Sequence, residues 1–146
     1  MKSVNYALRK AYVAALAPVN VDSVNVPVYY LTAPDSYTGN FYITLNSVSN
    51  ADDSTKNSSD TNTSMQVQIH TWSDSYNAGQ FADVIAGQVF EYIYPNSQAV
   101  LDLSGDGVQM VSTKLDQDLV NEMDGLGNRM FVTRILTFSH NIFHKN

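Results

Sequence analysis

The sequence predicts an α+β fold: a mainly antiparallel sheet with two helices packed on one face and a long polar hairpin loop. Two segments carry apolar residues at helical spacing, and several others are β-branched, aromatic or strictly alternating. The chain has 146 residues, 44% of them hydrophobic, which suits one core. We therefore expect residues 1–146 to form a single α+β domain.

The first helix is expected from Val4 to Leu16. Apolar residues recur there at helical spacing, on the side opposite Arg9 and Lys10. Pro18 sets the end of this helix, because the residue before a proline avoids the helical conformation.

Two strands are expected next. Val26–Leu31 is β-branched and aromatic, and Pro27 within it favours the edge of a sheet or the start of a strand. Phe41–Leu45 follows the turn-prone Gly39 and Asn40. From Asn46 to Ser64 the sequence changes to Asn, Ser, Thr and Asp, which predicts a polar hairpin loop, either mobile or ordered by a partner.

The segment from Met65 to Pro95 has the clearest pattern in the chain. Met65–Trp72 alternates, so one face of the strand is apolar and the other carries His70 and Trp72. Asn77 is expected to cap a helix that ends at Pro95. Its apolar stripe is predicted to consist of Phe81, Val84, Ile85, Val89, Tyr92 and Ile93.

The last third should hold a hairpin and a long final strand. Ala99–Leu103 and Val108–Ser112 flank Ser104-Gly105-Asp106-Gly107, which indicates a hairpin turn. Residues 122–128 are also turn-prone. Arg129–Phe143 is apolar on both faces, with Phe131 on one and Leu136 on the other, as expected of a central or covered strand.

No pattern in the sequence indicates a catalytic site, a metal site or a cofactor site. Asp102–Gly107 imitates the start of a calcium loop, but Thr113 stands where a bidentate glutamate is needed. His140 and His144 would lie about 13 Å apart on a strand, too far to share a metal, so surface or interface positions are expected. His70 is expected to be partly buried and hydrogen-bonded.

Composition narrows the class of protein further. The absence of cysteine excludes disulfides and thiolate chemistry, and neither a signal peptide nor a membrane span is expected, so the chain should be soluble and unexported. The formal net charge is -6, and the eight basic residues are scattered, which argues against nucleic-acid binding as the main role of the protein.

The order of these parts resembles the small tail-completion (tail-terminator) and neck proteins of tailed bacteriophages. The resemblance is carried by residues 67–74, Val-Gln-Ile-His-Thr-Trp-Ser-Asp, by the helix from Ala78 to Ile93, and by residues 101–108. Ala7–Ala11 and the final strand fit the same layout. Two features depart from the family pattern, namely the long polar insertion at 46–64 and the extended stretch at 114–128.

The resemblance implies a non-enzymatic virion subunit, present in the host cytoplasm during assembly. It would form a homo-oligomeric ring of six or more copies that ends the tail tube or joins the head connector to the tail. Its partners would be other neck, connector or tail-tube proteins, with DNA passing through the lumen without specific binding and no membrane involved.

Eight residues are expected to contact neighbouring subunits. They are Asp52, Asp53, Lys56, Asn57, Asp60, Trp72, Tyr76 and Phe143. Two other functions stay open at this point: a cellular α+β module that binds a small molecule or peptide, and a metal-dependent hydrolase using His70.

Overall fold

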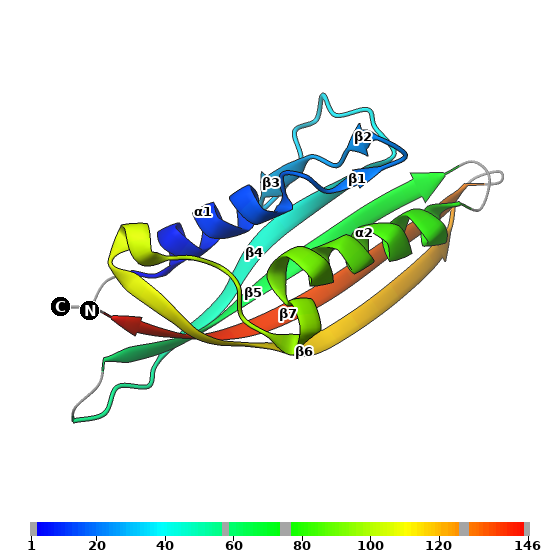
Figure 1. Ribbon diagram of the computed structural model, residues 1–146. Helices are drawn as coiled ribbons and strands as arrows, with labels where there is room; N and C mark the ends of the chain where they lie inside the picture. Colours follow the sequence, from blue (N-terminus) through cyan, green and yellow to red (C-terminus); the bar gives the residue numbers. More distant parts are fainter. Residues whose placement is uncertain (1–2, 57–58, 74–76, 126–128, 145–146) are drawn as a thin grey trace.

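In the described part of the chain, two α-helices lie on one face of a five-stranded sheet (Figure 1). A computed structural model describes residues 3–56, 59–73, 77–125 and 129–144. The main elements are α1 (Asn5–Leu16), β3 (Val28–Tyr30), β4 (Phe41–Asp52), β5 (Asp60–Ser73), α2 (Ala78–Ile93), β6 (Val108–Asp124) and β7 (Met130–His144). β1 (Asn20–Val21) and β2 (Val24–Asn25) form a separate small hairpin, and single 3-10 turns span η1 (Pro95–Ser97) and η2 (Ser104–Asp106). The expected α+β class is confirmed.

The sheet has the strand order β3-β4-β5-β7-β6. β3 runs parallel to β4, and the remaining neighbours are antiparallel. The short proline-preceded strand therefore lies at an edge, as its sequence predicted. β7 pairs with β5 on one side and β6 on the other, which confirms the central position expected for the last strand.

The core lies between the helices and the sheet. α1 buries Leu8, Tyr12 and Leu16, and β5 buries alternate residues from Met65 to Thr71, as its pattern predicted. Burial of these apolar side chains is the main favourable contribution to folding. Within the described residues, no helix is both long and apolar enough to cross a membrane.

The buried face of α2 differs from the predicted stripe. The helix begins after Asn77 and ends before Pro95 as expected, although no side-chain hydrogen bond from Asn77 caps it. Val84, however, is 49% exposed. Ala82 and Ala86 are buried instead, because the helix lies close to β5 and β7 and small side chains permit that approach. An amphipathic pattern that counts only large apolar residues misses this face.

The polar segment 46–64, expected to be a loop, is mostly strand. β4 continues to Asp52 and β5 begins at Asp60, so only a short connection remains. Thr61 and Thr63 are buried opposite β7 and have hydrogen-bond partners: the Thr61 hydroxyl lies 2.6 Å from His144 Nε2, and the Thr63 hydroxyl donates to the Ser49 carbonyl over 3.1 Å. Composition alone could not reveal that β7 supplies the partner of Thr61 and β4 that of Thr63.

The hairpin predicted around Gly105 is wrong. Residues 99–103 form no strand, and η2 with left-handed Gly107 turns the chain into β6. The Asp102 carboxylate accepts a hydrogen bond from the Ser104 N–H at 2.9 Å, a local turn that competes with strand pairing. β6 pairs with β7 along nearly its whole length, so its partner comes later in the sequence.

Two histidines expected at the surface or an interface are buried. His140 is 1% exposed and His144 is 3% exposed. His140 joins three elements: its Nε2 lies 2.5 Å from the Tyr12 hydroxyl of α1, and its Nδ1 lies 2.9 Å from the Thr113 hydroxyl of β6. One ring nitrogen of a neutral imidazole donates while the other accepts, so the two hydroxyls satisfy the ring in either tautomer.

Acid should destabilise the fold through His140. Burial lowers the pKa of this ring from 6.5 to about 4, so the unfolded chain takes up the proton first as the pH falls. Stability present above pH 6.5 is therefore lost between pH 6.5 and about 4, amounting to about 3 kcal/mol. Denaturant unfolding across this range measures the loss.

His140→Gln should flatten this pH dependence, because the amide does not titrate. His70→Gln is the control, and we expect it to have a smaller effect since that ring is only partly buried. A constant difference in unfolding free energy between wild type and His140→Gln at every pH would contradict the assignment.

Candidate interaction surface

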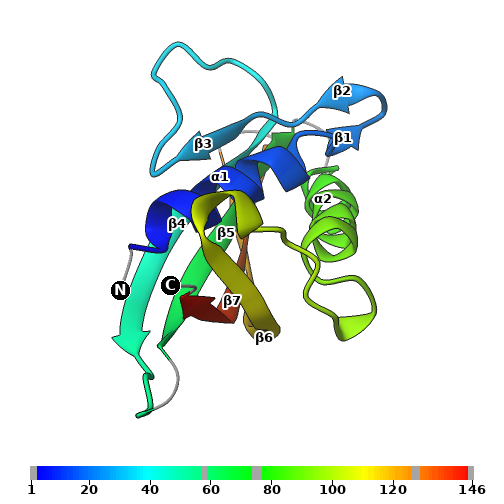
Figure 2. The ribbon, with the colours of Figure 1, turned by 60° about the vertical axis from the view of Figure 1, so that its left-hand side comes forward.

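The face of the sheet opposite the helices is open. α1 and α2 both pack on the other face, as two views of the ribbon show (Figures 1 and 2). Alternate residues of each strand therefore point away from the core, including the even-numbered residues of β5 and the odd-numbered residues of β7. This open face divides along the strands into an aromatic half and a polar half.

The aromatic half carries what we call the aromatic cluster, made of Tyr29, Tyr37, Tyr42, His70 and Trp72. Tyr42 and His70 are stacked with ring centroids 4.6 Å apart, and the His70 Nε2 lies 3.1 Å from the Thr44 hydroxyl. The expectation that His70 is partly buried and hydrogen-bonded is confirmed, and burial lowers its pKa. Trp72 meets the edges of Tyr37 and Tyr42 at 6.3 and 6.0 Å. Such tilted contacts are the favoured geometry of aromatic pairs.

A shallow hollow of about 340 Å³ lies beside this cluster. Its walls are the loop after β3, with Ala33, Pro34 and Tyr37, and the sheet, with Trp72 and Phe131 among others. The backbone N–H of Trp72 donates to the Asn40 carbonyl over 3.0 Å, and the Tyr37 hydroxyl donates to the Phe41 carbonyl. These two hydrogen bonds hold the loop against the sheet. No charged side chain is among the residues that line it.

Apolar side chains continue from this hollow to the edge strand β6. On this face Leu119 and Met123 are 48% and 60% exposed, and Phe131 on β7 is paired with Met123. Val120, which pairs with Arg134 on the helix side of the sheet, is 54% exposed. In the described structure, no strand pairs with the outer side of β6. A long free edge with exposed apolar residues marks a site of association.

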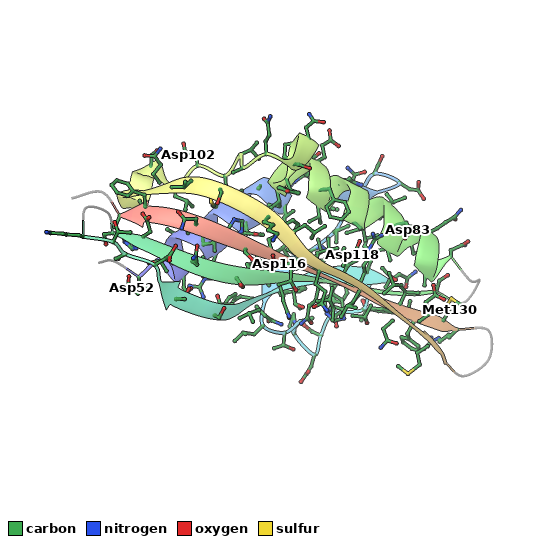
Figure 3. All side chains as sticks on the ribbon, turned by 90° about the horizontal axis from the view of Figure 1, so that it is seen from below. Asp52, Asp83, Asp102, Asp116, Asp118 and Met130 are labelled. Atoms are coloured by element: carbon green, nitrogen blue, oxygen red, sulfur yellow. The ribbon has the colours of Figure 1, made fainter. Side chains whose placement is uncertain are left out.

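Carboxylates accompany these apolar residues on β6. Figure 3 shows Asp116 and Asp118 near the middle of the sheet, with Asp83 of α2 close by. Arg134 of β7 holds Asp118 with two hydrogen bonds of 2.9 and 2.7 Å and reaches Asp83 at 3.1 Å. Its hydrogen bonds lower the pKa of Asp118. Asp116, on the other hand, accepts a hydrogen bond from the Ser139 hydroxyl.

The polar half of the open face carries mainly small hydroxyl and amide side chains, together with Lys114 and Asp116. A second hollow, of about 400 Å³, is lined there by Ser49, Asn62, Ser112, Lys114, Asn141 and their neighbours. The Asn141 amide donates to the Asn62 side-chain oxygen over 2.9 Å across β5 and β7. This half offers hydrogen-bonding side chains, and no phenylalanine, tyrosine or tryptophan is among the residues that line its hollow.

The predicted interface residues fall at opposite ends of the sheet. Asp52, Asp53, Lys56, Asp60 and Phe143 lie at one end, where Asp60 pairs with Phe143. Trp72 lies twelve residues from Asp60 along β5, about 40 Å away. Figure 3 shows this separation through Asp52 and Met130, the latter close to Trp72 in the pairing of β5 with β7. Asn57 and Tyr76 lie outside the described residues.

Sequence reasoning missed the exposed segment of β6. Residues 114–121 had no predicted strand, because Asp, Gln and Asn interrupt the apolar residues, and the turn predicted at 122–128 is wrong for its first residues, since β6 continues to Asp124. The alternation of Asp118, Val120 and Glu122 with Leu119, Asn121 and Met123 is the signal that could have shown an edge strand exposed on both faces.

The described residues contain no group of three or more histidines and carboxylates that could hold a metal ion. His140 and His144 are enclosed by hydroxyls in the core, and His70 is stacked against Tyr42. The surface features with the clearest geometry are therefore the aromatic cluster and the β6 edge, both suited to binding.

Comparison with solved structures finds a neighbour of the same fold. Its title is "Virion of native gene transfer agent (GTA) particle", and the match covers 97% of this chain and 92% of that chain. The TM-score is 0.57 and the sequence identity is 15%, so the likeness concerns the fold. Neither a protein-family model nor a curated protein matches this chain.

Replacing Tyr42 with alanine should loosen the aromatic cluster. The substitution removes the stack on His70 and the edge contact with Trp72. We expect the free energy of unfolding to fall by about 1–2 kcal/mol. The emission of Trp72, the single tryptophan, should shift to longer wavelength as water reaches it. Tyr6→Ala, at a position 61% exposed, is the control, and equal emission shifts in both variants would contradict the assigned contacts.

Proposed function

We propose that this chain is a structural subunit of a phage-like virion that acts by assembly. The observation that carries the proposal is the fold shared over nearly the whole length of both chains with a virion chain. The open sheet face and the unpartnered apolar edge of β6 support it, because a subunit needs such surfaces to bury against its neighbours.

The finer proposal is a ring in the neck or tail, of six or more copies, that joins the head connector to the tail or ends the tail tube. It rests on the order of elements shared with tail-completion proteins and on the two uncovered edges of the sheet. A ring suits a subunit whose contacting surfaces differ, since head-to-tail contacts close into rings when the rotation permits. The acidic net charge fits DNA passing through a lumen without adhering.

A second candidate is a module that binds a small molecule or peptide. The specific observation in its favour is the uncharged aromatic hollow beside Trp72. Pockets for such ligands are usually apolar, with a few polar groups. A ligand entering the hollow would change Trp72 emission, so titration with proline-rich or aromatic peptides tests this candidate directly.

The purified protein should form one closed species several times heavier than the 16.1 kDa chain. Light scattering coupled to size exclusion measures its mass, and electron micrographs should show rings with an open centre. A protein that stays monomeric at every concentration and never joins a particle would contradict the assembly role.

A further inference from the structure

The sheet has two free edges of different character. β6 lies at one end of the strand order, and its residues 116–124 have apolar and acidic side chains. At the other end β3 pairs only with Ile43–Leu45 of β4. Among the described residues, nothing pairs in the sheet with the outer side of β4 from Asn46 to Asp52.

The free edge of β4 carries signs of a missing neighbour. Asn46 Oδ1 and Ser47 Oγ are enclosed but have no hydrogen-bond partner among the described residues. Enclosed polar atoms without partners cost free energy, and a second chain can satisfy them. Val48 lies at a break in the register with β5 and is 51% exposed.

The two edges differ in charge, and this difference determines which edges of two copies can pair. The segment 116–124 contains Asp116, Asp118, Glu122 and Asp124 and no lysine or arginine. Pairing this edge with itself would bring carboxylates together, which is how edge strands are commonly kept apart. Residues 46–51 are all uncharged, so the β4 edge can accept the acidic edge without that repulsion.

The directions of β4 and β6 are also compatible with pairing between the two edges. The three antiparallel steps from β4 through β5 and β7 to β6 make β4 and β6 run in opposite directions. Copies placed side by side in one orientation therefore present antiparallel edges to each other. The two free segments are offset, because Ser49 aligns through Ser64 with Ser139, whereas Val120 aligns with Arg134. That offset, about five residues or ~17 Å, gives the stagger that a closed sheet of tilted strands requires.

We propose that residues 116–124 of β6 in one copy pair with residues 46–51 of β4 in a second copy, so that the sheet continues from subunit to subunit. This inference rests on the proposed ring assembly and names its contact. The interface is head-to-tail, and each copy contributes a different edge to each of its two neighbours.

Two single substitutions test the two edges separately. Val48→Glu places a carboxylate on the β4 edge opposite an acidic strand, and Leu119→Glu removes an apolar contact from β6 while adding charge. Each variant should be a folded monomer of 16.1 kDa by light scattering, with an unchanged circular dichroism spectrum because both positions are about half exposed. Val84→Glu, on the exposed side of α2, is the matched control and should assemble like wild type.

Mixing the two monomeric variants identifies the mode of pairing. The intact β6 edge of Val48→Glu should join the intact β4 edge of Leu119→Glu, and native mass spectrometry should show a mixed dimer that grows no further. Val48→Lys provides a second check: it should retain assembly and make it sensitive to salt, since its cation faces an acidic edge.

Each outcome has a distinct meaning. A wild-type protein that is monomeric contradicts the proposed function itself. A wild-type oligomer that survives either Glu substitution, or variants that form no mixed dimer, overturns the edge pairing and leaves the assembly role standing.

Discussion

The pairing of β5 with β7 is the constraint on which the rest of the structure depends. It runs without a register shift from Asp60 opposite Phe143 to Ser73 opposite Met130. A slip of one residue would turn the side chains of one strand, Val67 of β5 or Leu136 of β7, from the core to the open face, so the buried pattern fixes the register. The helices pack on the face that this register makes apolar, and the aromatic cluster forms on the other.

Several polar residues of this core meet each other, and buried Thr71 bonds to the carbonyls of Ala78 and Val132. Tyr12, His140 and Thr113 tie α1 to β7 and β6, and Thr61 meets His144 near the end of the sheet. Each group is of a kind that can donate or accept, so the set can be satisfied without charge. The long strands can therefore stay paired past the end of the apolar core, which is why a segment rich in Asn, Ser and Thr folds as sheet.

The sequence predicted the elements whose pattern is local. α1, the alternating half of β5 and the bounds of α2 follow from periodicity and proline positions. His70 and Trp72 share one face of β5 as predicted, and both contact Tyr42. The features that local patterns could not predict depend on pairing with strands that are distant in the sequence. The ends of β4 and β5 depend on β7, and the length of β6 depends on pairing with a strand that follows it. Asp60 and Trp72, both predicted to contact neighbouring subunits, lie far apart along β5, so different neighbours would contact them.

The hydrogen bonds between β5 and β7 lie across the strands, as in any antiparallel pair. A pull along the strand axis would therefore load the whole row in shear, and no bond could open before the others. Pulling across the strands would instead peel the bonds apart one by one. A sheet of such long, centrally paired strands resists force best along its strands, and a subunit carrying mechanical load would gain from aligning that direction with the load.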